Sequence, residues 1–478
     1  PVELLLALGR TEPLRDLLLR VMSHQNPDGD WPQWFMFFER ERGIRAGDSH
    51  GDIVFWPIVA LAQYLIASGD ADLLEARVPF FDAKGPQAGA RATVWEHVER
   101  ALTIIDRRRI AGTALAAYGH GDWNDSLQPA DPALRDHMCS AWTVTLHFQA
   151  LTMLARALRS VDRGARAEPL ERQAESVRGD FQRLLLPDGV LTGYAVFDGA
   201  AHVRYLLHPR DETSGVRYSS LAMIHAILED MLTADQTRAH LDIIRRELTG
   251  PDGVRLFDRP LPYHGGPQRI FQRAESATFF GREIGLMYMH AHLRYAQALA
   301  HVGAAEEFFR ALCQANPIGI RSIVPSATLR QANCYYSSSD AAFADRYEAR
   351  ARYERVRGGT IPLDGGWRVY SSGAGIALAL TLRRFLGLTR EARALCIDPV
   401  MPPALDGMRV MTSLRGHPLE VTYRVGARGC GVDGIALNGQ ALPFTREANP
   451  HRLGAARVTG EVLDRLSRSR NTLAIDLG

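Results

Sequence analysis

Residues 119–129 form the most distinctive stretch of the chain and read Gly-His-Gly-Asp-Trp-Asn-Asp-Ser-Leu-Gln-Pro. Two carboxylates, Asp122 and Asp125, flank Trp123 and an asparagine in a loop that begins with glycines, which let backbone and ligand approach closely. A Trp ring can stack on the apolar face of a sugar, and a nearby carboxylic acid can protonate a glycosidic oxygen. A turn rich in Asn and Asp, with Trp123 filling the core, explains the same residues, so both interpretations stay open at this point.

Around this loop, residues 1–390 carry apolar side chains at helical spacing. The expected helices are Leu14–Met22, Ile53–Ala67, Val94–Ile105, Ala141–Leu158, Leu170–Leu186, Ser219–Leu232, Gln236–Leu248, Glu283–His301, Ala304–Gln314, Ala341–Val356 and Ala374–Leu386. Long polar loops separate them, and long loops inside a compact domain usually carry function. We therefore expect a mainly α protein in which residues 1–388 form a helical toroid with its site at one mouth.

The pattern of residue types in the sequence changes near Leu388. From there on, short segments rich in Val, Leu and Ile alternate with turns of Gly, Pro and Asn, which is typical of strands. We expect residues 389–478 to form a small, separate β domain.

Composition excludes several classes of protein. The 478 residues include 56 Lys and Arg against 54 Asp and Glu, a net charge of +2, whereas a nucleic-acid-binding protein concentrates positive charge. Lys84 is the only lysine, which argues against a lysine nucleophile. Five scattered cysteines without a Cys-x-x-Cys pair predict a reducing, cytoplasmic environment and no cysteine zinc site. The longest apolar stretch, Ile53–Ala67, is too short to span a bilayer.

The Gly-Asp-Trp-Asn-Asp core at 121–125 resembles the signature of the glycoside phosphorylases in glycoside hydrolase family 94. The resemblance extends from about residue 21 to 425 and implies that Asp125 is the general acid, while Trp123 and Asp122 bind the donor sugar. The continuation 126–129, Ser-Leu-Gln-Pro, departs from the Gly-Met of cellobiose phosphorylases and looks more like the 1,2-β-oligoglucan phosphorylase branch.

A second segment carries the resemblance further upstream. Gly43-Ile44-Arg45 and Gly51-Asp52, followed by Ile-Val-Phe-Trp-Pro, resemble the stretch in which the family grips donor-sugar hydroxyls with an Arg and an Asp. The resemblance therefore assigns Arg45 and Asp52 to the substrate. Without it, a surface ion pair is the competing interpretation. Two departures are Gly51, where the family has a second Asp, and His24, where it commonly has a phosphate-linked Arg.

Phosphate binding is expected near residues 370–375, Tyr-Ser-Ser-Gly-Ala-Gly, because hydroxyl and backbone N–H groups at a helix start favour anions. Simple helix capping explains them as well. By resemblance, Ser371, Ser372 and His290 bind phosphate, with His292 as the competing histidine.

The resemblance also implies an acceptor-side contact. It assigns Glu275 to the acceptor sugar, whereas the polar tract 329–340, which includes Arg330, carries no assignment.

The resemblance implies that the helical toroid is an (α/α)6 barrel and that the C-terminal β domain is a β-sandwich of jelly-roll type. It implies inverting phosphorolysis of a β-glucoside, most simply a β-1,2-oligoglucan, to α-glucose 1-phosphate, with inorganic phosphate as co-substrate and neither metal nor organic cofactor. The expected partners are oligosaccharide and phosphate, with no nucleic acid and no membrane; a homodimer stays open.

Two alternatives to this activity also stay open. One is an inverting β-glucan hydrolase with Asp340, Glu275 or Asp52 as base. The other is a catalytically silent carbohydrate-binding segment, because the family's N-terminal β-sandwich is not in this sequence.

Overall fold

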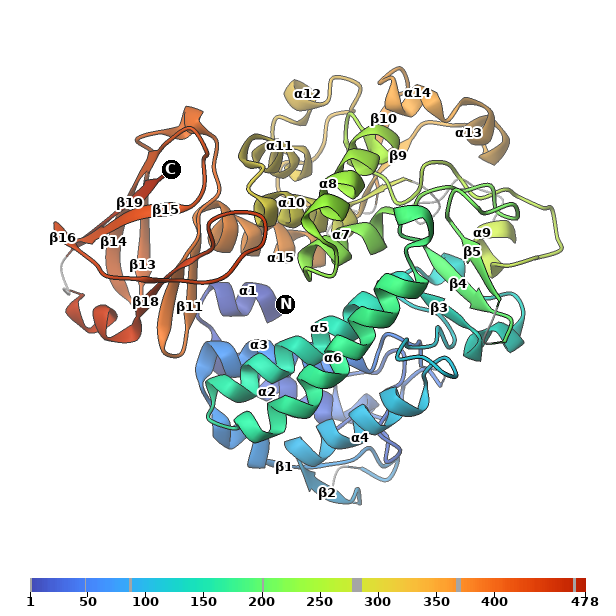
Figure 1. The fold of residues 1–478 in the computed structure, drawn as a ribbon, viewed down its shortest axis with the longest axis horizontal. Helices are drawn as coiled ribbons and strands as arrows, with labels where there is room; N and C mark the ends of the chain where they lie inside the picture. Colours follow the sequence, from blue (N-terminus) through green and yellow to red (C-terminus); the bar gives the residue numbers. More distant parts are fainter. Residues whose placement is uncertain are drawn as a thin grey trace.

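The computed structural model describes residues 2–47, 49–85, 88–199, 202–276, 286–366, 371–466 and 470–478. Helices dominate the first four-fifths of the chain and strands the remainder (Figure 1). No helix within these ranges is long and apolar enough to cross a bilayer.

A closed ring of helices organises the first part of the chain. Each ring helix packs against the next, and the first, α1, closes the ring by contacting both α15 and α3. In ring order the members are α1 (Val2–Ala7), α3 (Phe55–Ser68), α5 (Ala141–Ser160), α7 (Ser220–Leu228), α10 (Met289–Val302) and α15 (Ser371–Leu380). The longest, α5, is buried at most of its positions, as expected for a helix with neighbours on both sides.

Further helices cover this ring from outside. α2 (Thr11–Met22) packs on α3, α6 (Gly164–Leu184) on α5 and α11 (Ala305–Ala315) on α10. They are amphipathic: in α11 the buried residues recur on one face, and the other face is charged. The remaining helices are α4 (Val94–Arg107), α8 (Ala234–Ile243), α9 (Gln272–Ser276), α12 (Ile320–Ile323), α13 (Arg346–Arg352) and α14 (Glu354–Arg357).

Short antiparallel strands pair within the segments that connect the helices. They pair as β1 (Arg77–Pro79) with β2 (Arg91–Thr93), β3 (Met138–Ser140) with β4 (Tyr194–Phe197) and β5 (Val203–Leu206), β6 (Thr249–Gly250) with β7 (Gly253–Val254), and β8 (Met287–Tyr288) with β9 (Ser338–Ala341) and β10 (Leu363–Gly365). The helices expected over 283–301 and 341–356 begin later than predicted, at Met289 and Arg346. The preceding residues of β8 and β9 pair in a sheet instead of continuing the helix.

Two sheets make up the C-terminal part. One has the order β11 (Leu388–Glu391), β12 (Ala394–Ile397), β18 (Ala456–Thr459), β17 (Thr445–Arg446); the other has β13 (Arg409–Leu414), β14 (His417–Val425), β19 (Asn471–Leu477), β15 (Val432–Leu437), β16 (Gln440–Ala441). Leu419, Val421 and Tyr423 of β14 alternate into the core between them. The expected change to strands at Leu388 is observed, and all pairs are antiparallel except β14 with β19.

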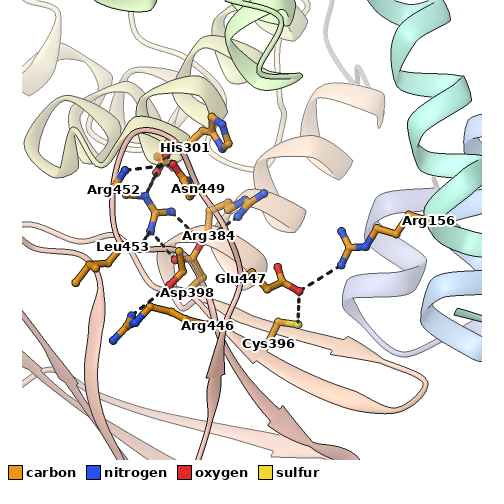
Figure 2. Close-up of polar contacts among 12 residues, drawn as sticks. Arg156, His301, Arg384, Cys396, Asp398, Arg446, Glu447, Asn449, Arg452 and Leu453 are labelled. Carbon is orange, nitrogen blue, oxygen red and sulfur yellow. Dashed lines mark hydrogen bonds and ion pairs between the residues drawn. The ribbon is translucent and has the colours of Figure 1, made fainter. Parts of the chain in front are cut away.

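Polar side chains fasten these sheets to the helices. In Figure 2, Arg452 and Asn449 lie against the end of α10, and Arg156 of α5 reaches toward Glu447. Arg452 pairs with Asp398 at 2.6 and 2.8 Å. A charged pair that is bidentate and largely buried holds its geometry firmly.

Candidate active site

The loop at 119–129 is bound on one side to residues 50–51. His50 and Gly119 form a β-bridge, and the Gly51 N–H donates to the Gly121 carbonyl at 2.8 Å. A Cβ atom on Gly51 would lie only 2.5 Å from the carbonyl oxygen of Tyr118. Glycine at the position where the family's paired Asp was expected therefore has a steric reason.

The other side of the loop is bound to residues 268–276. The Gln272 N–H donates to the Gln128 carbonyl at 2.9 Å, the Ala130 N–H donates to the Ile270 carbonyl at 2.8 Å, and the Arg273 guanidinium lies 3.3 Å from Ser126 Oγ. Backbone pairing on both flanks fixes the loop between two segments far apart in sequence.

Within the loop, side chains wind the backbone locally. Asp122 Oδ1 accepts the Asn124 N–H at 2.9 Å, and Asn124 Oδ1 accepts the Ser126 N–H at 3.3 Å. These two successive Asx turns lead into a short 3-10 helix over Asp125–Leu127. The Asn/Asp-rich turn expected from the residues therefore exists, and it presents Asp125 at its start.

Two of the three neighbouring carboxylates are buried. Asp52 is 3% exposed and Asp122 1%. Burial, with the charge of Asp122 beside it, raises the pKa of Asp52 to about 7, and burial raises the pKa of Asp122 to about 6. Asp52 Oδ2 accepts the Trp56 indole N–H at 3.0 Å, whereas its buried Oδ1 has no hydrogen-bond partner. Asp52 Oδ1 is thus a buried acceptor without a partner in the described part of the chain.

The third carboxylate, Asp125, reaches solvent: its side chain is 44% exposed. Its Oδ1 lies 3.8 Å from His50 Nδ1. The same histidine nitrogen lies 3.2 Å from the Asp122 carbonyl, and Nε2 lies 3.0 Å from the Gln128 amide. His50 thus lies beside the Asp125 carboxylate and also contacts the Asp122 carbonyl and the Gln128 side chain of the same loop. Sequence reasoning missed His50, although it directly precedes the Gly51-Asp52 motif.

Aromatic rings surround Trp123. Its ring lies 4.9 Å from Tyr288, 5.9 Å from His290 and 6.5 Å from Trp142, measured between centroids. The rings of Trp123, Trp142 and His290 border a cavity of about 500 Å³ inside the helix ring, also lined by Trp31. A largely apolar wall with several aromatic rings and few polar groups is typical of a small-molecule site. Trp142 was not singled out in the sequence.

Polar groups collect on one side of this cavity, where His290, Arg294 and Ser372 line it. Burial, with the charge of Arg294, lowers the pKa of His290 to about 4. Arg294 pairs with Glu3 of α1 at 2.7 Å. Ser371 begins α15, and its side chain is outside the described part of the chain. Glu3 also lines the cavity and offsets the charge of Arg294, so the imidazole and the hydroxyl are the groups that an anion can meet there.

The competing histidine, His292, is engaged elsewhere. Its Nε2 lies 2.8 Å from the Ala311 carbonyl, and its Nδ1 accepts the Val254 N–H at 3.3 Å. Both ring nitrogens are therefore occupied by backbone, as in a structural histidine.

Three further candidates lie outside this group. Arg45 stacks 3.7 Å from the Phe81 ring centroid and donates to Asn26 at 2.6 Å; its buried Nη1 has no partner, and no ion pair with Asp52 is found among the described residues. Glu275 accepts N–H groups of residues 269–271 at 2.6–3.0 Å, so it holds a loop. Arg330 donates to Ser339 at 3.0 Å. Sugar contacts of Arg45 and Glu275 stay predictions.

The family model of the glycosyl hydrolase 94 superfamily, catalytic domain, matches residues 33–354. The chain belongs to this family. A relative, 1,2-beta-oligoglucan phosphorylase of Listeria innocua serovar 6a, is 40% identical over 458 residues, 95% of this chain and 41% of the relative. Cyclic beta-(1,2)-glucan synthase NdvB of Rhizobium meliloti is 24% identical over 86% of this chain and 14% of its own length.

The chain thus spans less than half the length of these relatives. Among solved structures, a sialidase superposes with a TM-score of 0.51 at 12% identity, over 84% of this chain and 32% of that one. At this identity the likeness concerns the fold alone.

Proposed function

We propose that this chain is the catalytic part of an inverting phosphorylase that converts a β-1,2-linked oligoglucan and inorganic phosphate to α-glucose 1-phosphate. The observation that carries the proposal is the exposure of Asp125, which contrasts with the burial of Asp52 and Asp122 beside it. Family membership and the 40% identity to a 1,2-beta-oligoglucan phosphorylase support the reaction class and the linkage.

The proposal includes the finer architecture. The closed ring with helices outside it supports an (α/α)6 barrel over residues 1–388. The two sheets with a common core support a jelly-roll type sandwich over residues 389–478. The cavity with Trp123 then lies inside the barrel, where the donor sugar binds.

In this mechanism Asp125 protonates the oxygen that leaves the donor sugar. His50, 3.8 Å away, keeps the carboxyl oriented. Asp122, whose oxygens are engaged by the Asn124 N–H and the Thr143 hydroxyl, shapes the loop. The free Oδ1 of Asp52 accepts a donor hydroxyl, and Trp123 stacks on the ring. Protonation by a placed acid contributes about 10²–10⁴-fold to such a rate.

Phosphate attacks the anomeric carbon from the opposite face. His290, Ser371 and Ser372 hold it, with the charge of Arg294 on the same wall. An anionic nucleophile needs no carboxylate base, whereas an inverting hydrolase needs one to activate water. No metal ion or organic cofactor takes part in this scheme.

The test is release of sugar from sophorose and longer β-1,2-glucans with and without phosphate. Asp125→Asn should keep the fold and lose activity by about 10²–10⁴-fold, because an amide cannot donate the proton. Asp136→Asn, an exposed change nearby, is the matched control. Phosphate-independent hydrolysis would support the glucanase instead, and sugar binding without turnover would support a silent binding segment.

A cytoplasmic location completes the proposal. All five cysteines are free, which suits a reducing compartment. A homodimer stays a prediction, which light scattering of the purified chain tests.

A further inference from the structure

A second polar cluster lies at the far end of α10 from the cavity. Asp230, just after α7, meets His301, in the last turn of α10, and His451, in the loop between β17 and β18. His301 and His290 are on the same helix, and a rise of 1.5 Å per residue separates them by about 16 Å. The cluster is therefore distinct from the candidate active site.

The three side chains converge on one point. His301 Nε2 lies 2.7 Å from Asp230 Oδ1, and His451 Nε2 lies 3.2 Å from the same oxygen. One ligand atom from each residue lies within 4.8 Å of the others. The ligands of a tetrahedral zinc ion are about 3.3 Å apart, given bonds of about 2.0–2.1 Å, so small side-chain rotations suffice.

His451 supplies a further observation. Its side chain is only 7% exposed, and its buried Nε2 atom makes no well-aligned hydrogen bond within the described part of the chain, although Asp230 Oδ1 lies 3.2 Å away. His301 already takes the favourable position on the shared carboxylate oxygen. A buried nitrogen that only shares an acceptor in this way is incompletely satisfied, and a metal ion would give it a full partner.

The loop carrying His451 is held in place by its neighbours (Figure 2). Asn449 donates to the His301 carbonyl at 3.1 Å and accepts the His451 N–H at 2.8 Å. Arg452 donates to the His301 carbonyl at 3.1 Å, while Asp398 balances its charge. The ligands are therefore positioned before any ion binds, which is what a metal site requires.

We propose that Asp230, His301 and His451 bind one divalent ion of the zinc class, which links the helices to the C-terminal sheets. Two imidazoles and a carboxylate suit zinc. Calcium and magnesium prefer oxygen ligands alone, so this set does not suit them. Asp230 is 38% exposed, so water can complete the coordination. Because the ligands come from three distant segments, an ion bound only to the folded chain stabilises that state.

A second grouping of metal-ligand atoms among the described residues is unsuitable. Glu391, Cys396 and Glu447 also lie close together, but guanidinium groups already neutralise them. Arg156 and Arg457 lie 2.7 and 2.6 Å from the two oxygens of Glu391. Fixed cations in these places repel a metal ion.

The experiment uses the full chain after treatment with a chelator. Zinc chloride is titrated by calorimetry, bound zinc is counted after dialysis, and thermal melting is followed with and without zinc. The expected result is one zinc per chain and a higher melting temperature with zinc. His451→Gln and Asp230→Asn should each abolish both effects, and His202→Ala, an exposed control, should keep them.

The substitutions at residues 230 and 451 are chosen to disturb folding as little as possible. Residue 230 has a φ of 50°, which Asn tolerates well, and Gln retains a hydrogen-bonding group at residue 451. Melting of the zinc-free variants checks that they fold. The proposal is overturned if the wild-type chain binds no stoichiometric zinc, if both variants bind it as well as the wild type, or if calcium binds in its place.

Discussion

Alanine at residue 51 should damage both stability and catalysis. The new Cβ would lie 2.5 Å from the Tyr118 carbonyl oxygen, against about 3.4 Å for an ordinary contact, so the segments around residues 51 and 118 must separate by about 0.9 Å. The hydrogen bond from the Gly51 N–H to the Gly121 carbonyl, now 2.8 Å long, would be broken by that shift. Overpacking costs about 1–3 kcal/mol. The lost hydrogen bond adds about 1 kcal/mol.

The same shift displaces Asp125. A misplacement of about 1 Å in a catalytic group can lower the rate by about 10²-fold. We therefore expect Gly51→Ala to lower the melting temperature and to reduce phosphorolysis of sophorose by about two orders of magnitude. The assay is initial-rate production of glucose 1-phosphate beside a thermal melt.

Gly179→Ala is the matched control. A Cβ at residue 179, in α6, meets nothing within 4 Å, and alanine favours helix, so this variant should be as stable as the wild type or more so. If Gly51→Ala matched the wild type in both assays, the claim that residues 50–51 position the acid would be refuted.

Three further outcomes are expected. Ser372→Ala with His290→Ala should raise KM for phosphate far more than KM for glucan in steady-state kinetics; equal rises would make these residues structural. Because the pKa of Asp52 is raised from 3.8 to about 7, the unfolded chain loses this proton first, so stability should fall as pH rises through that window. Asp52→Asn should flatten that part of a melting-temperature profile, and an unchanged profile would contradict the raised pKa. Synthesis from α-glucose 1-phosphate and glucose should give sophorose; cellobiose as the main product would contradict the β-1,2 linkage while leaving phosphorolysis intact.

The long helices could be predicted because their pattern is local. The expected helix 141–158 is observed as Ala141–Ser160, since apolar residues repeat over five turns. Strands such as β8, with two residues, leave no readable pattern, so the starts of two helices were predicted too early. The closing member α1, with six residues, is also too short to recognise. Its place depends on α3 and α15, far away in sequence.

The site was predictable where residues adjoin in sequence. Trp123, Asp122 and Asp125 come together because one loop carries them, and Asp52 joins them through the bridge at His50. Glu275 shows the limit: its carboxylate binds three backbone amides, and nothing in the sequence specifies that choice over a sugar. His50 was missed for the same reason, because its partners are chosen by the folded chain.

The double attachment of the 119–129 loop has a consequence for protein engineering. Its backbone hydrogen bonds run to residues 50–51 on one flank and to 270–272 on the other, so the loop is a seam: a shift of either segment is transmitted to it. A library that varies only residues 270–272 also shifts Asp125 on the same loop, so under the proposed mechanism it mixes altered sugar recognition with lost catalysis. Substitutions that redirect specificity should therefore be introduced in side chains that leave the seam's backbone bonds intact, or in both flanks together.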